Sequence, residues 1–423
     1  MQNQEASAKE IASHFIARAR IDEAEINAFS EVYSASAQCD AAHVDRLVKQ
    51  GKPSGSLAGV PIAIKDNIDT LPGPCSAGLA RFANHRPSRD AKLVRLLRSA
   101  GAVIIGAART DAGAFGVITP EVGNPVFPDR IAGGSSGGPA AAVAAGQCTV
   151  AIGTDTGGSL RIPAACCGVY GFKPTYGRVS LDGVRPLADS YDHAGPIAKR
   201  INDLIAVMRV IDPKFGDTSG RPIKEPLVIG VPRNCFRDAS SEVQRSFDEF
   251  LSWAKLRGCR VRELVLPTSD EFLPIHLALS LYEAARHYEY LSARELSALP
   301  EPAMQGIQYG RAVKQPQFEK ARKEKSALVR QISAAIKSVD ALALPTLPIL
   351  APARGTQEVL LGTEPTDLLL ALIRYTAVFD QTGHPALACP WSSNENDVPS
   401  SIQLVGQRDH DLRLLSIAME LGL

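Results

Sequence analysis

A lysine and two serines in glycine-rich surroundings have residue types and spacing suited to nucleophilic chemistry. Lys65 follows the apolar run 60–64, and Ser135 and Ser159 lie within the segments GGSSGG and GTDTGGS. A serine hydroxyl becomes a good nucleophile only when a base takes its proton. A lysine can be that base when burial disfavours its ammonium form. The three residues therefore predict a serine hydrolase whose base is a lysine, with Ser135 relaying the proton between Lys65 and Ser159.

The segment that ends at Ser159 also offers backbone hydrogen-bond donors. Cleavage of an amide requires donors for the tetrahedral oxyanion, and backbone N–H groups suit this role. Thr156, Gly157, Gly158 and Ser159 supply four consecutive N–H groups, two of them from residues without a side chain. We expect an oxyanion hole here. A phosphate-binding P-loop is excluded because no Lys-Ser or Lys-Thr pair ends the glycine run.

Strands and helices alternate along the first half of the chain, which predicts an α/β architecture. The apolar run that ends at Ile64 predicts a buried strand, with Lys65 directly after it. The other elements expected in this half are a helical region at 5–50, helices at 90–98 and 139–145, and strands at 102–105 and 150–152.

The second half begins after a surface linker predicted at 210–225. It is rich in charged residues with helical periodicity before apolar strand patterns return near the end. The elements expected are a strand from Leu227 to Val231, helices over 240–335 with loops near 296–303, a strand broken by prolines at 341–350, a helix at 366–380, and closing strands at 385–390 and 402–405.

The overall composition excludes several classes of function. The chain has 423 residues and a net charge of +1, so it presents no field that attracts nucleic acid or an anionic membrane. Its start has no basic segment leading into an apolar core, and no stretch is long and apolar enough to span a membrane. Its eight cysteines are scattered without a CxxC pair, which predicts reduced thiols in a cytoplasmic protein and no metal site.

The glycine-rich block resembles the central signature of the amidase signature family. The resemblance covers GGSSGG and residues 153–175, and extends to 59–67, 190–196 and 403–406. It implies that Ser159 is the acyl-forming nucleophile, that Ser135, after a cis peptide bond from Gly134, is the relay, and that Lys65 is the base. The remaining roles that it implies are an oxyanion hole from the backbone amides of 156–159 and support from Asp155, Arg161 and Ser136, the first two as an ion pair.

The same resemblance implies a fold and a division of the chain. The fold is one α/β domain over 1–423, with a central mixed, twisted β-sheet covered by α-helices. Within it we expect four parts: an N-terminal helical segment at 1–50, a catalytic core at 55–210, a helical insertion at about 240–335 and a closing segment at 340–423. No metal or organic cofactor is expected.

The activity implied is hydrolysis of the C–N bond of a small amide or ureide through an acyl-enzyme on Ser159. Within the family, the segments Ile131-Ala-Gly-Gly and Asp192-His193-x-Gly-Pro resemble most the branch that contains carboxybiuret hydrolase. The chain departs from the family pattern at Ala112, where an acidic residue is common, and in a short loop over 116–125. Because this region usually lines the pocket, the family's substrate contacts do not carry over there.

The sequence is also compatible with other functions. The chain resembles amidotransferase subunits that pass ammonia to a partner chain, and a non-catalytic relative would keep the same motifs. An α/β-hydrolase esterase would use Ser136 within Gly-x-Ser-x-Gly, with Asp192 and His384 as its partners. Arg161 offers a substrate carboxylate a charged partner as an alternative to the ion pair. A homodimer or a small accessory subunit fits the family.

Overall fold

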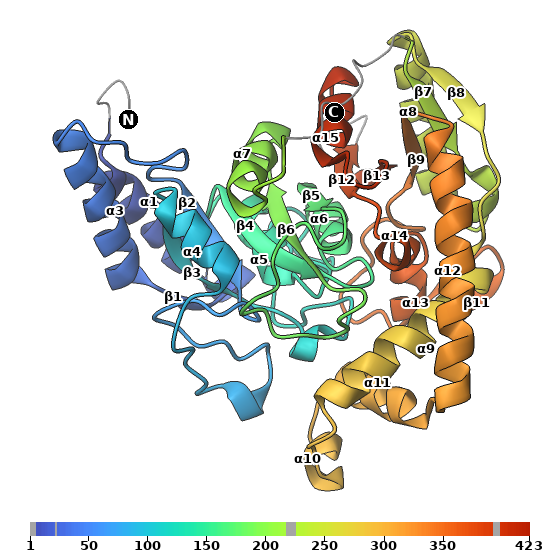
Figure 1. Ribbon diagram of the computed structural model, residues 1–423, viewed down its shortest axis with the longest axis horizontal. Helices are drawn as coiled ribbons and strands as arrows, with labels where there is room; N and C mark the ends of the chain where they lie inside the picture. The colour runs from blue at the N-terminus through green and yellow to red at the C-terminus, as the bar shows by residue number, and fades with distance from the viewer. Residues whose placement is uncertain (1–5, 22, 217–225, 392–397) are drawn as a thin grey trace.

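A mixed β-sheet runs through the middle of the protein in the computed structural model (Figure 1). The structure describes residues 6–21, 23–216, 226–391 and 398–423. The strands are β1 (Phe29–Val32), β2 (Pro61–Lys65), β3 (Val103–Ala108), β4 (Val150–Asp155), β5 (Tyr170–Lys173), β6 (His193–Ala198), β7 (Val228–Val231), β8 (Arg260–Glu263), β9 (Ala341–Pro345), β12 (Ala386–Trp391) and β13 (Ser400–Val405), with a separate hairpin of β10 (Glu358–Leu361) and β11 (Glu364–Asp367).

Within these described ranges the sheet has eleven strands in the order β1-β3-β2-β4-β6-β5-β12-β13-β9-β7-β8. Strand β2 is parallel to β3 and β4, and β7 is parallel to β8 and β9. The other neighbouring pairs are antiparallel. The predicted α/β fold with a large mixed sheet is therefore confirmed.

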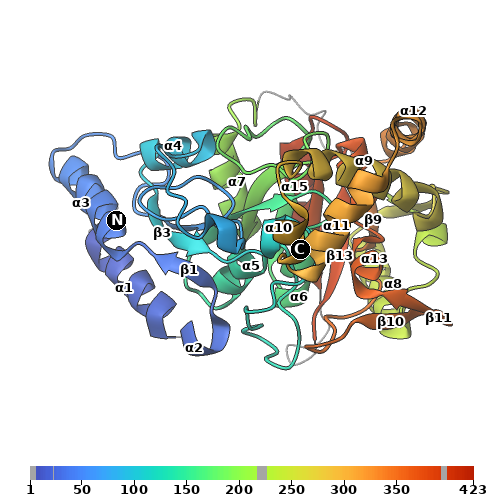
Figure 2. The same cartoon turned by 90° about the horizontal axis from the view of Figure 1, so that it is seen from below.

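Helices lie against both faces and the ends of the sheet. They are α1 (Ala8–Ile21), α2 (Glu23–Ile26), α3 (Ser34–Lys49), α4 (Lys92–Ser99), α5 (Gly137–Ala144), α6 (Arg161–Cys167), α7 (Ile201–Ile211), α8 (Ser241–Leu256), α9 (Ser269–His287), α10 (Ala293–Ser297), α11 (Glu301–Ala312), α12 (Gln315–Lys337), α13 (Leu368–Ile373), α14 (Ala377–Thr382) and α15 (Asp411–Glu420). Figure 2 shows α1, α2 and α3 at one end of the protein and the β10–β11 hairpin at the other. No helix in the described ranges combines the length and apolarity that a membrane crossing requires.

The alternation of side chains along the central strands separates two apolar layers. On β2, Ile62 and Ile64 belong to the layer that includes α4 and α7, whereas Ala63 belongs to the layer that includes α1, α3 and α5. Successive strand residues point to opposite faces of a sheet. Lys65 follows the same alternation as Ala63, so its side chain lies on the α5 side. The strand thus aims this lysine at the loop that leads into α5.

Three predicted elements are wrong in detail. The region 5–50 is not one helical segment, because Phe29–Val32 forms the edge strand β1 against β3. The charged stretch Arg260–Glu263 within the expected helical region is the opposite edge strand, β8, which pairs with β7. The expected helix at 366–380 is two short helices, α13 and α14. Of the predicted linker at 210–225, residues 217–225 lie outside the described residues.

Candidate functional site

Lys65 lies at the carboxyl end of β2, next to the carboxyl end of the parallel strand β4. The register pairs Ile64 with Ile152, which brings Lys65 level with the last residues of β4. Its Nζ donates hydrogen bonds to Ser135 Oγ and to Thr154 Oγ1, each at 2.8 Å. The sequence-predicted lysine and the first serine are therefore in direct contact.

The Lys65 side chain is fully buried. Burial lowers the pKa of Lys65 from 10.5 to about 7, although the negative charges of Asp111, Asp155 and Asp192 act in the opposite direction. An amine exposed to water would be almost entirely protonated at neutral pH. At this site a large fraction of Lys65 is neutral at pH 7 and can accept a proton.

Ser135 and Ser136 occupy the turn before α5, and their hydroxyls contact different strands, Ser135 the Lys65 side chain of β2 and Ser136 the backbone of β4. The peptide bond from Gly134 to Ser135 is cis, as the family resemblance implies. Ser136 Oγ donates to the Thr154 carbonyl at 3.1 Å and accepts from the Thr154 N–H at 3.3 Å. Ser136 is fully buried, and its hydroxyl is used by the backbone of β4. This arrangement contradicts the esterase interpretation, in which Ser136 is an exposed nucleophile.

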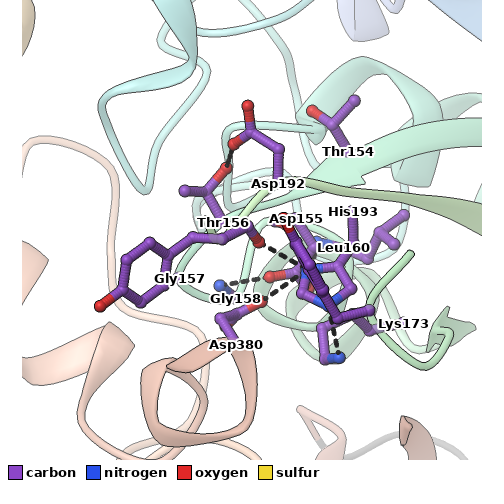
Figure 3. A network of polar contacts seen from close by, with 12 residues as sticks. Thr154, Asp155, Thr156, Gly157, Gly158, Leu160, Lys173, Asp192, His193 and Asp380 are labelled. Atoms are coloured by element: carbon purple, nitrogen blue, oxygen red, sulfur yellow. Dashed lines mark hydrogen bonds and ion pairs between the residues drawn. The ribbon is translucent and has the colours of Figure 1, made fainter. Parts of the chain in front are cut away.

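Asp155, the last residue of β4, folds the following loop back on itself (Figure 3). Its Oδ1 accepts the Gly158 N–H at 2.6 Å, and its Oδ2 accepts the Leu160 N–H at 3.0 Å. The two bonds hold the turn between β4 and α6, and Ser159 lies between the two bonded residues.

Arg161 lies between the carboxyl groups of Asp155 and Asp380 and is fully buried. Its Nε and Nη2 donate to the two oxygens of Asp155 at 2.9 and 3.0 Å, and Nη2 also donates to Asp380 Oδ2 at 2.6 Å. Its Nη1 donates to the Thr376 carbonyl at 2.9 Å and to Gln403 Oε1 at 2.7 Å. These contacts use all five N–H groups of a guanidinium, so none is left for a substrate carboxylate.

Two further titratable groups, Lys173 and His193, lie on the Asp380 side of this site (Figure 3). Lys173 Nζ is 3.1 Å from His193 Nε2, and His193 Nδ1 is 3.5 Å from Asp380 Oδ1. Burial would raise the pKa of Asp155, but the charge and hydrogen bonds of Arg161 hold it well below its usual range. Burial and the neighbouring Asp155 charge raise the pKa of Asp380. Asp155 is therefore the ionised partner of Arg161.

A second carboxylate ties the loop to the segment before β6. Asp192 Oδ1 accepts the Thr156 hydroxyl at 2.6 Å (Figure 3), and its Oδ2 accepts the N–H groups of Leu187 and Ala188 at 2.8 and 3.0 Å. Burial raises the pKa of Asp192 to about 6, although its hydrogen bonds act in the opposite direction. Thr156 is thus held through its side chain.

A cavity of about 440 Å³ reaches Ser159. Thr156, Gly157 and Ser159 form part of its wall, and helices α9, α11 and α13 supply much of the rest. The wall mixes polar side chains with apolar ones, and the apolar ones include Phe115, Leu187, Leu281, Leu370 and Ile373. Among the described residues of this wall, two are acidic (Glu301 and Asp367) and none is lysine or arginine.

The backbone amides beside Ser159 differ in what they contact. The Gly158 N–H is taken by Asp155. In the described part of the chain, the N–H groups of Thr156, Gly157 and Ser159 have no protein acceptor, and Ser159 Oγ has no hydrogen-bond partner, Ser135 Oγ included. These three amides and the hydroxyl are available to a bound molecule.

Sequence reasoning missed several residues of this site. Thr154 Oγ1 is the second acceptor of Lys65 Nζ and also accepts from Asn67 Nδ2 at 3.1 Å. The signals that could have indicated this role were its position between Gly153 and Asp155 and the parallel pairing of β2 with β4. Asp380 has no sequence signal, because it comes from the closing segment. His276 lies on α9, outside the signature, and lines the cavity.

The described residues contain no group of three or more histidine, cysteine, aspartate or glutamate side chains placed to hold a metal ion. His384, the other partner in the esterase interpretation, lies 3.2 Å from Ser333 Oγ and 2.9 Å from Thr382 Oγ1. His384 therefore bonds residues other than Ser136, and it is not among the described residues that line the cavity.

Comparisons with known proteins agree with this fold. The family model described as Amidase matches residues 10–415. The chain is 32% identical to a glutamyl-tRNA(Gln) amidotransferase subunit from Methanothermobacter thermautotrophicus, over 100% of this chain and 97% of the relative. It is 30% identical to the corresponding subunit from Koribacter versatilis, over 99% and 95%.

Solved structures give the same result. A crystal structure of an amidase superimposes with a TM-score of 0.92 at 32% identity, over 100% of this chain and 97% of the other. A protein from a vestigial complex related to the origins of an s-triazine catabolic enzyme superimposes with a TM-score of 0.90 at 28% identity, over 100% and 96%. The chain therefore belongs to the amidase family and is an amide-cleaving enzyme.

Proposed function

We propose that the protein hydrolyses the C–N bond of a small amide through an acyl-enzyme on Ser159. The observation that carries the proposal is the contact of 2.8 Å between Lys65 Nζ and Ser135 Oγ, fully buried and beside the loop that presents Ser159 to a cavity. Burial supplies a neutral amine, and the cavity supplies room for a substrate at the hydroxyl.

The proposed mechanism moves one proton along two hydroxyls. Neutral Lys65 accepts the proton of Ser135 while Ser135 accepts the proton of Ser159, whose Oγ attacks the amide carbon. The same path in reverse delivers a proton to the leaving nitrogen as the C–N bond breaks. Water, activated by the same base, then hydrolyses the ester on Ser159. The relay requires Ser135 Oγ and Ser159 Oγ to approach on substrate binding, since catalytic hydrogen bonds often tighten only in the complex.

The proposed oxyanion hole has fewer backbone donors than the four that we expected from the sequence. Asp155 already holds the Gly158 N–H, at 2.6 Å. The donors proposed for the oxyanion are the N–H groups of Thr156, Gly157 and Ser159, all on the cavity wall. The Asp155–Arg161 pair and Ser136 are proposed to support this loop, because each is buried and bonded to its backbone or to β4.

The charge of the cavity favours a neutral or positively charged substrate. Its described wall carries Glu301 and Asp367 and no lysine or arginine. A carboxylate bound here would lose water without gaining a charged partner, which is costly. A neutral amide, a ureide or an amide that bears an amine fits better than a carboxylated substrate of the carboxybiuret kind.

The second candidate is an amidotransferase component that releases ammonia for a partner chain. The observation that favours it is the identity of 30% to 32% with proteins named as glutamyl-tRNA(Gln) amidotransferase subunits, over almost the whole chain. An accessory subunit would be required for that activity. A homodimer and a cytoplasmic location remain predictions, as does the division of the chain into four parts.

An ammonia-release screen over amides of different charge tests the proposal. The panel contains propionamide as a neutral amide, glycinamide as a cationic one, and malonamate and glutamine as substrates with a carboxylate. We expect release from the first two, abolished in Ser159→Ala. Release from glutamine alone, stimulated by an added partner protein, would favour the amidotransferase candidate. Release from malonamate in preference to propionamide would contradict the charge argument.

A further inference from the structure

His276 lies where the nucleophile loop meets the cavity. It is on α9, is 4% exposed and lines the cavity together with Ser159 and Gly157. Its Nε2 is 3.2 Å from the position that a Cβ on Gly157 would occupy. The edge of the ring that carries Nε2 therefore borders Gly157, whose N–H has no acceptor in the described part of the protein.

Neither ring nitrogen of His276 has a hydrogen-bond partner among the described residues. Nδ1 is buried without one, and the nearby hydroxyl of Ser280 donates at 2.7 Å to the backbone carbonyl of His276 rather than to the ring. The ring instead meets Tyr191 edge to face, with centroids 5.1 Å apart. Buried polar side chains usually have a partner; Nε2, the ring nitrogen next to Gly157 on the cavity wall, has none among the described residues and is free to contact a bound molecule.

The histidine is neutral over the range in which the enzyme is expected to work. Burial lowers the pKa of His276 from 6.5 to about 3, and the positive charges of Lys325 and Arg161 act in the same direction, against Asp155. A neutral imidazole has one N–H. A buried N–H without an acceptor is costly, so the proton belongs on Nε2, which borders the cavity, rather than on Nδ1.

We infer that His276 is a catalytic residue that donates a hydrogen bond from Nε2 to the carbonyl oxygen of the reacting amide, as a side-chain member of the oxyanion hole. The inference rests on the proposed function of the same site. It adds a donor from α9, outside the signature motifs, to the backbone donors of Thr156, Gly157 and Ser159. A neutral imidazole in this place polarises the carbonyl without exchanging a proton with it.

Two substitutions and a control test the inference. His276→Phe removes the donor and keeps the ring, whereas His276→Gln restores an N–H near the position of Nε2. His384→Gln is the matched control, because His384 is also buried and has a lowered pKa but lies away from the cavity wall. The readouts are the rate of inactivation by a fluorophosphonate, whose P=O oxygen takes the place of the oxyanion, and kcat/KM for 4-nitroacetanilide, which has one carbonyl oxygen.

We expect His276→Phe to slow both reactions about 100-fold to 1000-fold, as loss of one oxyanion donor does. His276→Gln should recover most of this loss, His384→Gln should stay within about twofold of the parent, and the shape of the pH profile should not change, because a donor that stays neutral does not titrate. Unchanged rates in His276→Phe, with Ser159 still labelled, would overturn the inference and leave the proposed function intact. Equal slowing in His384→Gln would also overturn it, by showing a structural effect. Failure of the parent protein to label at Ser159 would instead defeat the proposed function.

Discussion

Replacing Lys65 and varying the pH together test how burial creates the base. With a pKa of about 7, roughly half of Lys65 is neutral at pH 7, against about 0.03% for an ordinary lysine with a pKa near 10.5. Burial therefore raises the available base about a thousandfold at neutral pH. We expect kcat/KM to rise about tenfold per pH unit below pH 7 and to level off above about pH 8.

The substitution that isolates this effect is Lys65→Met. Methionine fills most of the buried space but cannot accept a proton, so we expect kcat/KM to fall about 10²-fold to 10⁴-fold, the usual contribution of a general base. The assay is ammonia release at pH 5 to 9, with thermal unfolding as a control for the fold. The same lowered pKa means that the folded chain binds this proton more weakly than the unfolded chain, so the free energy of unfolding should decrease as the pH falls from 10 toward 7. A flat profile from pH 5.5 to 8, or a Lys65→Met variant within tenfold of the parent, would refute the reasoning.

Two further substitutions test the support of the nucleophile loop. Arg161→Met leaves the ionised carboxylate of Asp155 buried without its cation, so we expect a loss of about 3–5 kcal/mol in the free energy of unfolding, measured with urea; a loss below about 1 kcal/mol would contradict the role given to the ion pair. Gly158→Ala places a Cβ in steric overlap with Thr376 Oγ1 at a residue with φ of +139°, so we expect a destabilised protein with little activity in the ammonia assay. Parent-like activity and stability in this variant would show that the loop can take another path.

The sequence predicted the part of the site that lies within contiguous motifs. The apolar run before Lys65 and the glycine-rich segments around Ser135 placed these residues at a strand end and in a turn, as the structure has them. Local pattern is sufficient here because each motif is a strand or turn with its functional residue at the end. The predicted cis bond before Ser135 is confirmed as well.

The partners of these residues were less predictable, because tertiary packing brings them from distant segments. Asp380 on α14 meets the side chain of Arg161 on α6, although more than two hundred residues separate them in the sequence. His276 lies on a helix whose periodicity does not show which face lines a cavity. No local sequence pattern predicts the contact of Asp380 with Arg161 or the position of His276 at the cavity.

The missed edge strands have a different cause. Phe29–Val32 follows a helical pattern of apolar residues and is only four residues long, so its strand pairing with β3 is decided by the neighbouring strand rather than by its own sequence. Arg260–Glu263 is largely exposed and charged, as edge strands often are, and so lacks an apolar strand pattern.

The most direct test of the central claim, that Ser159 is the nucleophile and Lys65 its base, is fluorophosphonate labelling followed by peptide mapping with mass spectrometry. The account predicts a single adduct on Ser159, which is lost or greatly slowed in Lys65→Met while Ser136→Ala still labels at Ser159. An adduct on Ser136, or labelling of Ser159 at the parent rate in Lys65→Met, would contradict it.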